Sequence, residues 1–288
     1  MTKPRTTTTN IDNAITDHFL FKRFELLALN QFKWTGLPRG LEERHVERVL
    51  FNEGRALFFR DDLDGFFCLP CSPGQGVNVY GDPLEYVATG FNYTKHVPAA
   101  KSVLIENNKL RMPTRFAIEY FVNQLFEVVR TRDVNIKTLK APFIITTDDK
   151  SVLTVKKALD DIVNNVYAVF ADKSYGLNEA VNVFQTGVKC MTGELTDVYH
   201  DILNEALTYL GINNANTDKR ERLITSEAES NNQFIDSCAE MFLEARKRAA
   251  EDINDRFGLS VSVELRTPRE APVTVSEGGF ENGISSIS

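Results

Sequence analysis

Residues 204–216 read NEALTYLGINNAN and mark the place where a helical pattern gives way to a polar segment. Before this place, apolar residues recur at helical spacing from Gly193 to Leu210, and Gly211 is the residue type that most often follows a helix end. After it, residues 213–229 are polar and charged and contain the run DKRER at 218–222. The stretch predicts a helix that ends in a long polar loop.

A second long helix is predicted on the far side of this loop. Ser226 and Glu229 have the spacing of a capping box, which indicates a helix over about 227–257 that ends at Gly258. At about 1.5 Å per residue such a helix spans about 45 Å, which is too long for a compact domain of this size to surround. Residues 259–265 then alternate between apolar and polar types, which predicts a strand.

Toward the N-terminus, the clearest helix opens at Pro113. Its apolar residues lie at i, i+3, i+4, i+7, i+8 and i+11, the pattern of one buried face. These residues are Ile118, Phe121, Val122, Leu125, Phe126 and Val129. Between Val134 and Phe184 the pattern changes to short apolar runs, which predict a small α/β insertion with strands at 143–147, 152–155 and 167–170.

The N-terminal part predicts a helix followed by a β-rich stretch. The helix is expected from Asn13 to Lys33, is ended by Gly36-Leu37-Pro38, and is apolar on more than one face. Such a helix has to be covered on more than one side, either within the fold or by a neighbouring subunit. A short helix is expected at 42–51, and strands are expected at 56–60, 65–69 and 84–89.

Composition and charge exclude several classes of protein. The 288 residues are 42% apolar and 25% charged, and no apolar run reaches the roughly 18 residues of a membrane-spanning helix. The N-terminus lacks the apolar core of a secretory signal, so we expect a cytosolic protein with reduced cysteines. Lys and Arg number 33 against 40 Asp and Glu, and the net charge of -7 argues against a general nucleic-acid binder.

The motifs of enzymes and cofactor sites are missing from the sequence. It has no phosphate-binding glycine loop and no nucleophile or metalloprotease motif, so we expect no catalytic residue, no cofactor and no metal. Cys68 and Cys71 form a C-x-x-C pair, but Cys190, Cys238 and the four histidines show no spacing that completes a zinc site. Buried or loop thiols are the favoured interpretation, and a metalloprotein is the remote alternative.

A resemblance to a known family rests on the run at 204–216 and its charged continuation through Lys219-Arg220-Glu221-Arg222 to Ser230-Asn231. These residues resemble portal proteins, the upper collar or head-tail connector of small short-tailed phages with protein-primed DNA. Agreement extends over nearly the whole chain apart from the C-terminal tail. It includes 34–38, 58–59, 107–113, 242–243, 245–246, 253–254 and 257–259.

The resemblance implies an α+β fold, predominantly helical, with the wing, helical stem and α/β clip of phage portals, assembling as a ring. In such a ring, neighbouring copies would cover the apolar faces that a monomer leaves exposed. The implied segments are a flexible N-terminal arm at 1–12, a wing at 13–111, a stem helix at 112–133, a clip at 134–187, a stem helix at 188–212, a channel loop at 213–230, a wing helix and strand at 231–266, and a disordered tail at 267–288.

The implied function is a non-enzymatic portal at one capsid vertex, through which double-stranded DNA is packaged and later ejected. Implied partners are eleven further copies in a homododecamer, DNA without sequence specificity, the major capsid protein and scaffold, a separate packaging ATPase, and then the lower collar or tail protein, with no membrane involved. The protein would assemble in the host cytoplasm and remain in the virion. The alternative is an oligomeric head-tail connector that binds only protein partners.

Candidate site residues follow from the same resemblance. Lys219 and Arg220 match basic positions of the family's channel loop, and Arg222, Asn213 and Asn216 belong to the same segment. On charge alone this mixed-sign segment would be a solvated loop, although basic residues on a loop can contact phosphates without base specificity. Motor or tail docking is expected in the clip, at Asp148, Asp149, Lys150, Lys156 and Lys157.

Two departures from the family limit what the resemblance implies. Gln185 and Glu194 stand where a familiar relative carries lysines in the lower channel, which puts a ring of lysines in doubt. Twelve copies with a net charge of -7 each would give the ring a net charge of -84, so much of its channel would repel DNA and let it slide. The N-terminus keeps only Lys3 and Arg5, so the RNA binding of that relative's basic arm is not carried over.

Overall fold

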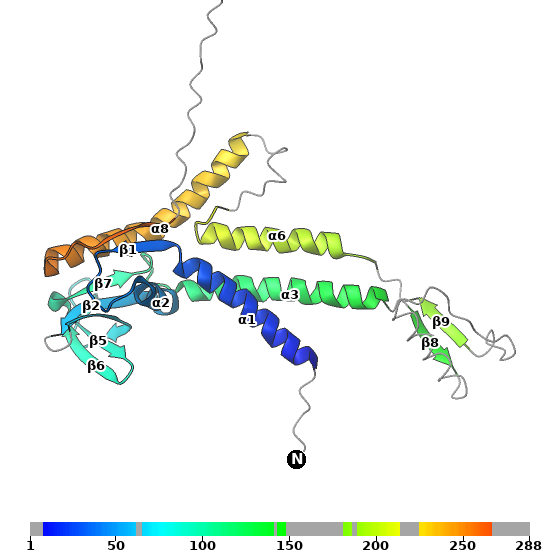
Figure 1. Cartoon of the computed structure of the whole chain (residues 1–288), viewed down its shortest axis with the longest axis horizontal. Helices are drawn as coiled ribbons and strands as arrows, with labels where there is room; N and C mark the ends of the chain where they lie inside the picture. The colour runs from blue at the N-terminus through cyan, green and yellow to red at the C-terminus, as the bar shows by residue number, and fades with distance from the viewer. Residues whose placement is uncertain are drawn as a thin grey trace, which may run out of the picture.

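The computed structural model describes residues 8–61, 65–140, 143–147, 181–185, 189–213 and 225–266. The described chain has three parts that follow one another along its long axis (Figure 1). A β-rich lobe lies at one end, three helices form the middle, and a pair of strands lies at the other end. The chain is therefore elongated, and its helices project from the lobe.

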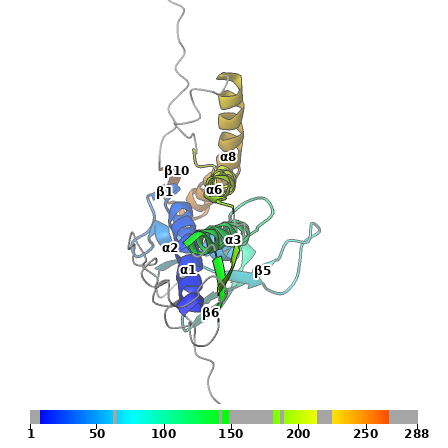
Figure 2. The ribbon, with the colours of Figure 1, turned by 90° about the vertical axis from the view of Figure 1, so that its right-hand side faces the viewer.

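The middle part consists of α1 (Thr8–Leu29), α3 (Thr114–Lys140) and α6 (Thr192–Tyr209). Figure 2, viewed along the long axis, shows α6 above α3 and α1 beside α3. The three helices share a core with Phe51, and its other buried members are Leu20, Phe24, Ala28, Ile118, Phe121, Val122, Leu125, Ala206 and Leu210. The apolar face predicted from periodicity after Pro113 is therefore the face that packs on α1 and α6.

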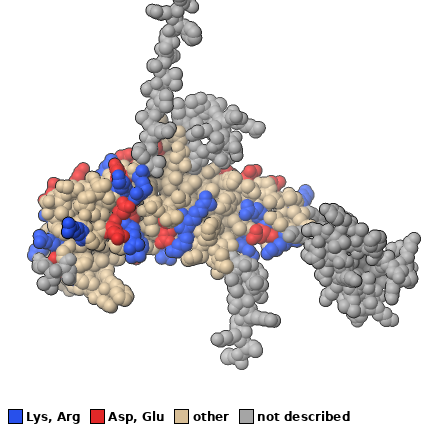
Figure 3. All heavy atoms as spheres, in the orientation of Figure 1, with Lys and Arg blue, Asp and Glu red and all other residues tan. Residues whose placement is uncertain are grey.

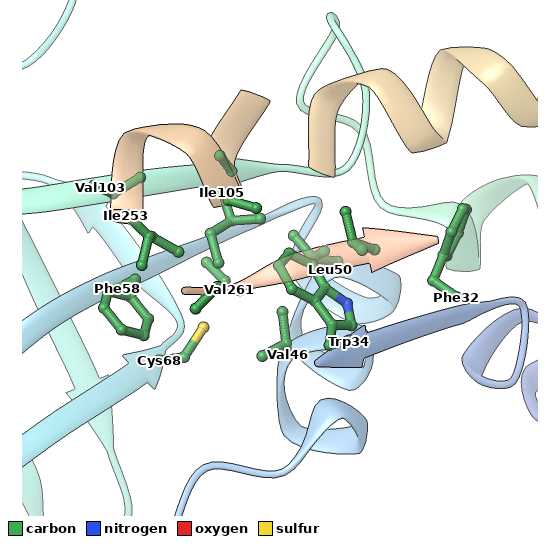
Figure 4. Packing of buried hydrophobic residues seen from close by; sticks show 14 of the residues in the cluster. Phe32, Trp34, Val46, Leu50, Phe58, Cys68, Val103, Ile105, Ile253 and Val261 are labelled. Atoms are coloured by element: carbon green, nitrogen blue, oxygen red, sulfur yellow. The ribbon is translucent and has the colours of Figure 1, made fainter. Parts of the chain in front are cut away.

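The lobe is built around α2 (Glu43–Glu53), the C-terminal half of α8 (Thr225–Phe257) and an antiparallel sheet. The sheet has the order β3-β2-β7 and consists of β2 (Arg55–Asp61), β3 (Gly65–Leu69) and β7 (Ser102–Glu106). Figure 4 shows side chains from these elements, from residues 32–34 and from Val261 meeting in one core. The labelled residues are Phe32, Trp34, Val46, Leu50, Phe58, Cys68, Val103, Ile105, Ile253 and Val261. Burial of this apolar surface holds α8 on the lobe.

Three further sheets complete the described fold, and all their strand pairs are antiparallel. A second sheet of the lobe has the order β4-β5-β6, formed by β4 (Cys71–Pro73), β5 (Glu85–Gly90) and β6 (Tyr93–Pro98). A 3-10 turn, η1 (Ala99–Lys101), links β6 to β7. β1 (Phe32–Thr35) pairs with β10 (Ser262–Leu265), and β8 (Phe143–Thr147) pairs with β9 (Val181–Gln185) at the far end of α3.

The predicted N-terminal helix is wrong at both ends. α1 begins at Thr8, before the expected start at Asn13, and ends at Leu29 instead of Lys33, well before Gly36. Phe32 and Trp34 lie in β1, where they are buried and alternate with exposed residues. Apolar residues spaced two apart fit either a many-faced helix or a strand, and the pairing with β10 favours the strand.

The helix after Pro113 also extends further than predicted. α3 continues to Lys140, so residues 134–140 are helical and do not begin the α/β insertion. Val134 and Ile136 are exposed, and a helix that no longer buries one face loses its apolar periodicity. The prediction therefore mistook the end of burial for the end of the helix.

Most other predicted elements are confirmed. The strands at 65–69 and 143–147 have the predicted bounds, and the helices at α2, α6 and α8 begin and end within about two residues of them. β4, β6, β7 and β9 were missed. β4 has only three residues, and β6 has the polar run Thr94-Lys95-His96 at its centre. The strands predicted at 152–155 and 167–170 lie outside the described residues.

Candidate functional site

The candidate channel loop is defined here by the two helix ends that flank it. Asn213 is exposed and follows α6, and α8 starts at Thr225. Asn216, Lys219, Arg220 and Arg222 lie between these points, outside the described residues. What the structure shows is therefore the root of the loop, meaning residues 209–213 and the part of α8 that they contact.

Gly211 brings the root into direct contact with the backbone of α8. Its φ of +70° lies in the left-handed region, which glycine adopts without strain. A Cβ atom placed on Gly211 would lie 2.5 Å from the amide nitrogen of Ala239 and 2.4 Å from its Cβ. Ala239 is completely buried by this approach. Position 211 therefore accommodates only glycine, and α6 ends against α8.

Hydrogen bonds and ring contacts hold the rest of the root. The amides of Gly211 and Ile212 donate to the carbonyls of Thr208 and Leu207, each over 2.9 Å, and the Gln31 side chain donates to the carbonyl of Leu210. The Tyr209 ring lies 5.9 Å from the Phe242 ring of α8. Burial raises the pKa of the Tyr209 hydroxyl. The loop therefore leaves from a rigid base.

A buried ion pair fixes α8 to the lobe beside this root. Arg246 Nη2 donates to Glu47 Oε2 over 2.7 Å and Arg246 Nε donates to Glu47 Oε1 over 2.9 Å, and both residues are at most 3% exposed. Asn107 Oδ1 accepts a further bond from Arg246, and Trp34 Nε1 donates to Glu47 over 2.7 Å. The Arg246 guanidinium also lies 4.1 Å from the centroid of the Phe32 ring. This group joins α8 to α2, β1 and the segment before α3.

Sequence reasoning missed this ion pair. Glu47 and Arg246 lie 199 positions apart, so no local spacing connects them. The available signal was that each is a charged residue next to buried apolar positions, Val46 in α2 and Phe242 four residues before Arg246 in α8. A charge on the buried face of a helix requires a partner, because an unpaired buried charge is strongly destabilising.

The exposed side of α6 is acidic. Its acidic residues lie at i, i+3, i+7 and i+11, so they share one face, and α6 contains no Lys or Arg. These residues are Glu194, Asp197, Asp201 and Glu205, and all are exposed. Figure 3 shows red atoms along the edge of the molecule that α6 occupies in Figure 1. The predicted site residue Glu194 therefore belongs to an acidic stripe.

The predicted clip is only partly described. Gln185 is the last residue of β9 and pairs with Phe143 of β8, whereas Asp148, Asp149, Lys150, Lys156 and Lys157 lie outside the described residues. Asn135 of α3 connects the two chain segments at this end. Its amide nitrogen donates to the Lys189 carbonyl over 2.8 Å, and its oxygen accepts from the Met191 amide over 3.1 Å. These two hydrogen bonds hold α3 to the start of α6, on the helix side of the strand pair.

The C-x-x-C pair lies in the lobe. Cys68 belongs to the core between the β2-β3-β7 sheet and α2, and burial raises its pKa well above the usual range. Burial also raises the pKa of Cys71 to about 11, so both thiols are protonated at neutral pH and are poor metal ligands. Within the described ranges, no three His, Cys, Asp or Glu residues gather as a metal site would require.

The described part of the chain also contains no helix with both the length and the apolar composition needed to cross a membrane.

Three solved structures are similar to this chain over most of its length. The portal and tail of native bacteriophage P68 match at 16% identity over 94% of each chain, with a TM-score of 0.49. A HK97 family phage portal protein from Corynebacterium diphtheriae matches at 10% identity, 92% of this chain and 96% of its own, with a TM-score of 0.46. The neck of an empty GTA particle matches at 9% identity over 91% of this chain and 84% of its own, with a TM-score of 0.48.

A family comparison reaches almost the whole described chain. The model of the family described as Phage Connector (GP10) matches residues 8–269, which include the lobe, the three middle helices, the loop root and the buried ion pair. The match begins where α1 begins and ends just after β10. This protein belongs to the phage connector family.

Proposed function

We propose that this chain is the subunit of a dodecameric portal ring at one capsid vertex, through which double-stranded DNA is packaged and ejected. The match to the phage connector family over residues 8–269 carries the proposal. The ring would be a structural channel without catalysis of its own, so a separate packaging ATPase would supply the energy. It would assemble in the host cytoplasm and remain in the virion.

Uncovered apolar surface on the helices supports assembly. Ile15, Phe19 and Leu26 of α1 are 61%, 65% and 62% exposed in one copy. Phe116 and Tyr120 of α3 are exposed as well, and so are Phe234 and Met241 of α8. Ile15 with Phe19, and Phe116 with Tyr120, lie one helical turn apart, so each pair exposes neighbouring apolar side chains. Such surface favours contact with another protein, and in a closed ring each copy would receive it from its neighbours.

The charge of the helices supports a channel role. If α3 and α6 form the stem, the acidic stripe of α6 gives a wall that repels the phosphates of DNA and lets the duplex slide. Lys219, Arg220 and Arg222 would then supply the few positive charges at the channel loop, and Asn213 and Asn216 would complete that loop. The firm root at Gly211 suits a loop that has to keep its place beside moving DNA.

The remaining segments fit the same assignment. Residues 13–111 and 231–266 would form the wing, 112–133 and 188–212 the stem, and 134–187 the clip. The clip would contact the packaging ATPase and later the tail through Asp148–Lys150, Lys156 and Lys157. The wing would contact the major capsid protein and scaffold.

The native mass of the purified protein tests the proposal. Twelve copies of 32.5 kDa give 390 kDa, and mass photometry in moderate salt should show a discrete species at that mass. A protein that stays monomeric alone and with scaffold and capsid protein would refute the ring. A ring that never retains DNA in assembled particles would favour the alternative, a connector that binds only protein partners.

A further inference from the structure

The loop between β4 and β5 is built as a fixed projection from the lobe. Asn78 organises it, because its Oδ1 accepts bonds from the amides of Tyr80 and Asp82, each over 2.9 Å. Two backbone bonds close its base, from the Asn78 amide to the Asp82 carbonyl over 2.8 Å and from Leu84 to Gly76 over 3.0 Å. Its conformation is therefore set before any partner binds, which lowers the entropy cost of binding.

The tip of this loop displays apolar side chains to solvent. Val79 is 93% exposed and Tyr80 is 88% exposed, and neither is used in the packing of its own chain. Tyrosine is among the residues that contribute most to protein interfaces when a pocket receives it. An ordered loop that holds Val79 and Tyr80 outward has the form of an anchor.

A cavity of about 670 Å³ lies on another side of the lobe. Its apolar lining includes Leu41, Val49 and Leu69, and Arg39, Arg48 and Arg115 line it as well. This volume is within the range of pockets that hold a large ligand group. Guanidinium groups beside apolar walls suit an aromatic ring with a hydroxyl, because Arg stacks on such rings and donates hydrogen bonds.

The loop and the cavity lie at opposite ends of β5. The loop leads into β5 at Glu85, and Gly90 at the other end of the strand lines the cavity. Five steps along a strand cover about 17 Å. The β3-β2-β7 sheet also separates the loop from the cavity. Arg111 bonds both Asp82 of the loop and Glu106 of β7, so the loop lies near the β7 edge. The cavity is lined by β3, which forms the opposite edge. Figure 2 shows the loop leading into β5 on the side away from α2.

The charges of the two features are complementary. Asp82 and Glu85, with Glu106 beside them, carry three negative charges against the one positive charge of Arg111, which bonds Asp82 and Glu106. The cavity has three arginines against two carboxylates, Glu53 of its lining and Glu119, which pairs with Arg115. The opposite net charges of the loop and the cavity favour their association. Like charges disfavour contact between two loops or between two cavities.

We propose that Val79 and Tyr80 of one copy insert into this cavity of the next copy and that the contact repeats around the ring. An anchor on one side and a receptor on the other make a head-to-tail contact, which closes into a ring when the rotation between copies allows it. The proposal rests on the ring assembly argued above, and it adds the residues that join neighbouring wings.

A photo-crosslinker tests which surfaces meet. The full-length protein carries p-benzoylphenylalanine in place of Tyr80, and native mass and crosslinked peptides are measured on the same sample. We expect 390 kDa particles with crosslinks between copies, from position 80 to peptides containing residues 39–53 or 66–70. The control protein carries p-benzoylphenylalanine in place of Gln75, which is exposed at the base of the loop. It should give few crosslinks to these peptides.

The two outcomes that count against the proposal are distinct. Rings of the correct mass whose crosslinks from position 80 map elsewhere would overturn the loop contact and leave the portal function intact. Wild-type protein that never forms a ring, with or without scaffold and capsid protein, would overturn both.

A double-mutant cycle tests the contact independently of crosslinking. Tyr80→Ala and Arg48→Ala should each raise the protein concentration needed for half-assembly about tenfold, and the double variant should be little worse than either. Arg44, exposed on α2 but not part of the cavity lining, provides the matched control, and Arg44→Ala should combine additively with Tyr80→Ala. Additive effects of Tyr80→Ala and Arg48→Ala would overturn the proposal.

Discussion

Gly211 packs directly against Ala239, since a Cβ on Gly211 would lie 2.4 Å from the Ala239 Cβ and 2.5 Å from its amide nitrogen. Replacing Gly211 by Ala should therefore lower the free energy of unfolding by about 2–4 kcal/mol, through the clash and the positive φ together. Urea unfolding of the purified protein measures the effect. Gly193→Ala is the matched control, because Gly193 has no neighbour within 4 Å and lies in α6, where alanine favours the helix by up to about 1 kcal/mol. Equal effects of the two substitutions would contradict the close approach.

The ion pair between Glu47 and Arg246 should matter most when only one partner is removed. Arg246→Met leaves a buried carboxylate and should destabilise the fold by about 3–5 kcal/mol. The double variant Glu47→Leu with Arg246→Met should recover much of that loss, because no buried charge remains. Arg248→Met, which removes an exposed pair with Glu244, should cost less than about 1 kcal/mol in the same unfolding experiment. An Arg246→Met protein as stable as wild type would show that the pair is not buried in solution.

The basic residues of the loop should affect DNA and not assembly. The triple variant Lys219→Ala, Arg220→Ala, Arg222→Ala is expected to form rings of unchanged mass, while the DNA retained per particle falls. Quantitative PCR of nuclease-treated particles gives the measurement. A control with Lys33, Arg44 and Lys247 changed to Ala removes three exposed charges elsewhere. If both variants package normally, the loop has no role in holding the genome.

The cysteines should react in an order set by burial. Cys190 is exposed and its pKa is lowered by hydrogen bonds from Thr192, so it should be alkylated first at pH 7.5. Burial raises the pKa of Cys71 to about 11, so its thiolate fraction and its rate should rise about tenfold for each pH unit up to that value. Because this pKa is above the ordinary value, the stability that the protonated thiol contributes should be lost as the pH rises from about 9 toward 11. Peptide mapping after timed iodoacetamide treatment distinguishes the sites.

Local pattern predicted the helices best where one face is buried and the other is not. The run after Pro113 has this property as far as Phe126, and the predicted apolar face is buried, on α1 and α6. After Val129 no described residue of this helix is fully buried, so its apolar residues no longer recur at helical spacing and the sequence does not indicate a helix there. Gly211 was recognised as a helix end, but its contact with Ala239 depends on how α8 is placed and could not be read from the sequence.

Long-range contacts account for the other misses. Phe32 and Trp34 become strand residues because β10 lies beside them, and β10 is formed more than two hundred positions later in the chain. The partnership of Glu47 with Arg246 has the same origin. The candidate residues Lys219, Arg220 and Arg222 rest on family resemblance, and their positions lie outside the described part of the chain.

The pairing of β1 with β10 also orders events during synthesis. Trp34 and Phe32 leave the ribosome early, yet their strand partners, Val263 and Leu265, are among the last described residues to be made. The lobe therefore cannot close while translation is still in progress through α8, whereas α1, α3 and α6 can pack before then. A chain interrupted before Ser262 would lack the strand that pairs with Phe32 and Trp34, so the edge of β1 would stay unpaired.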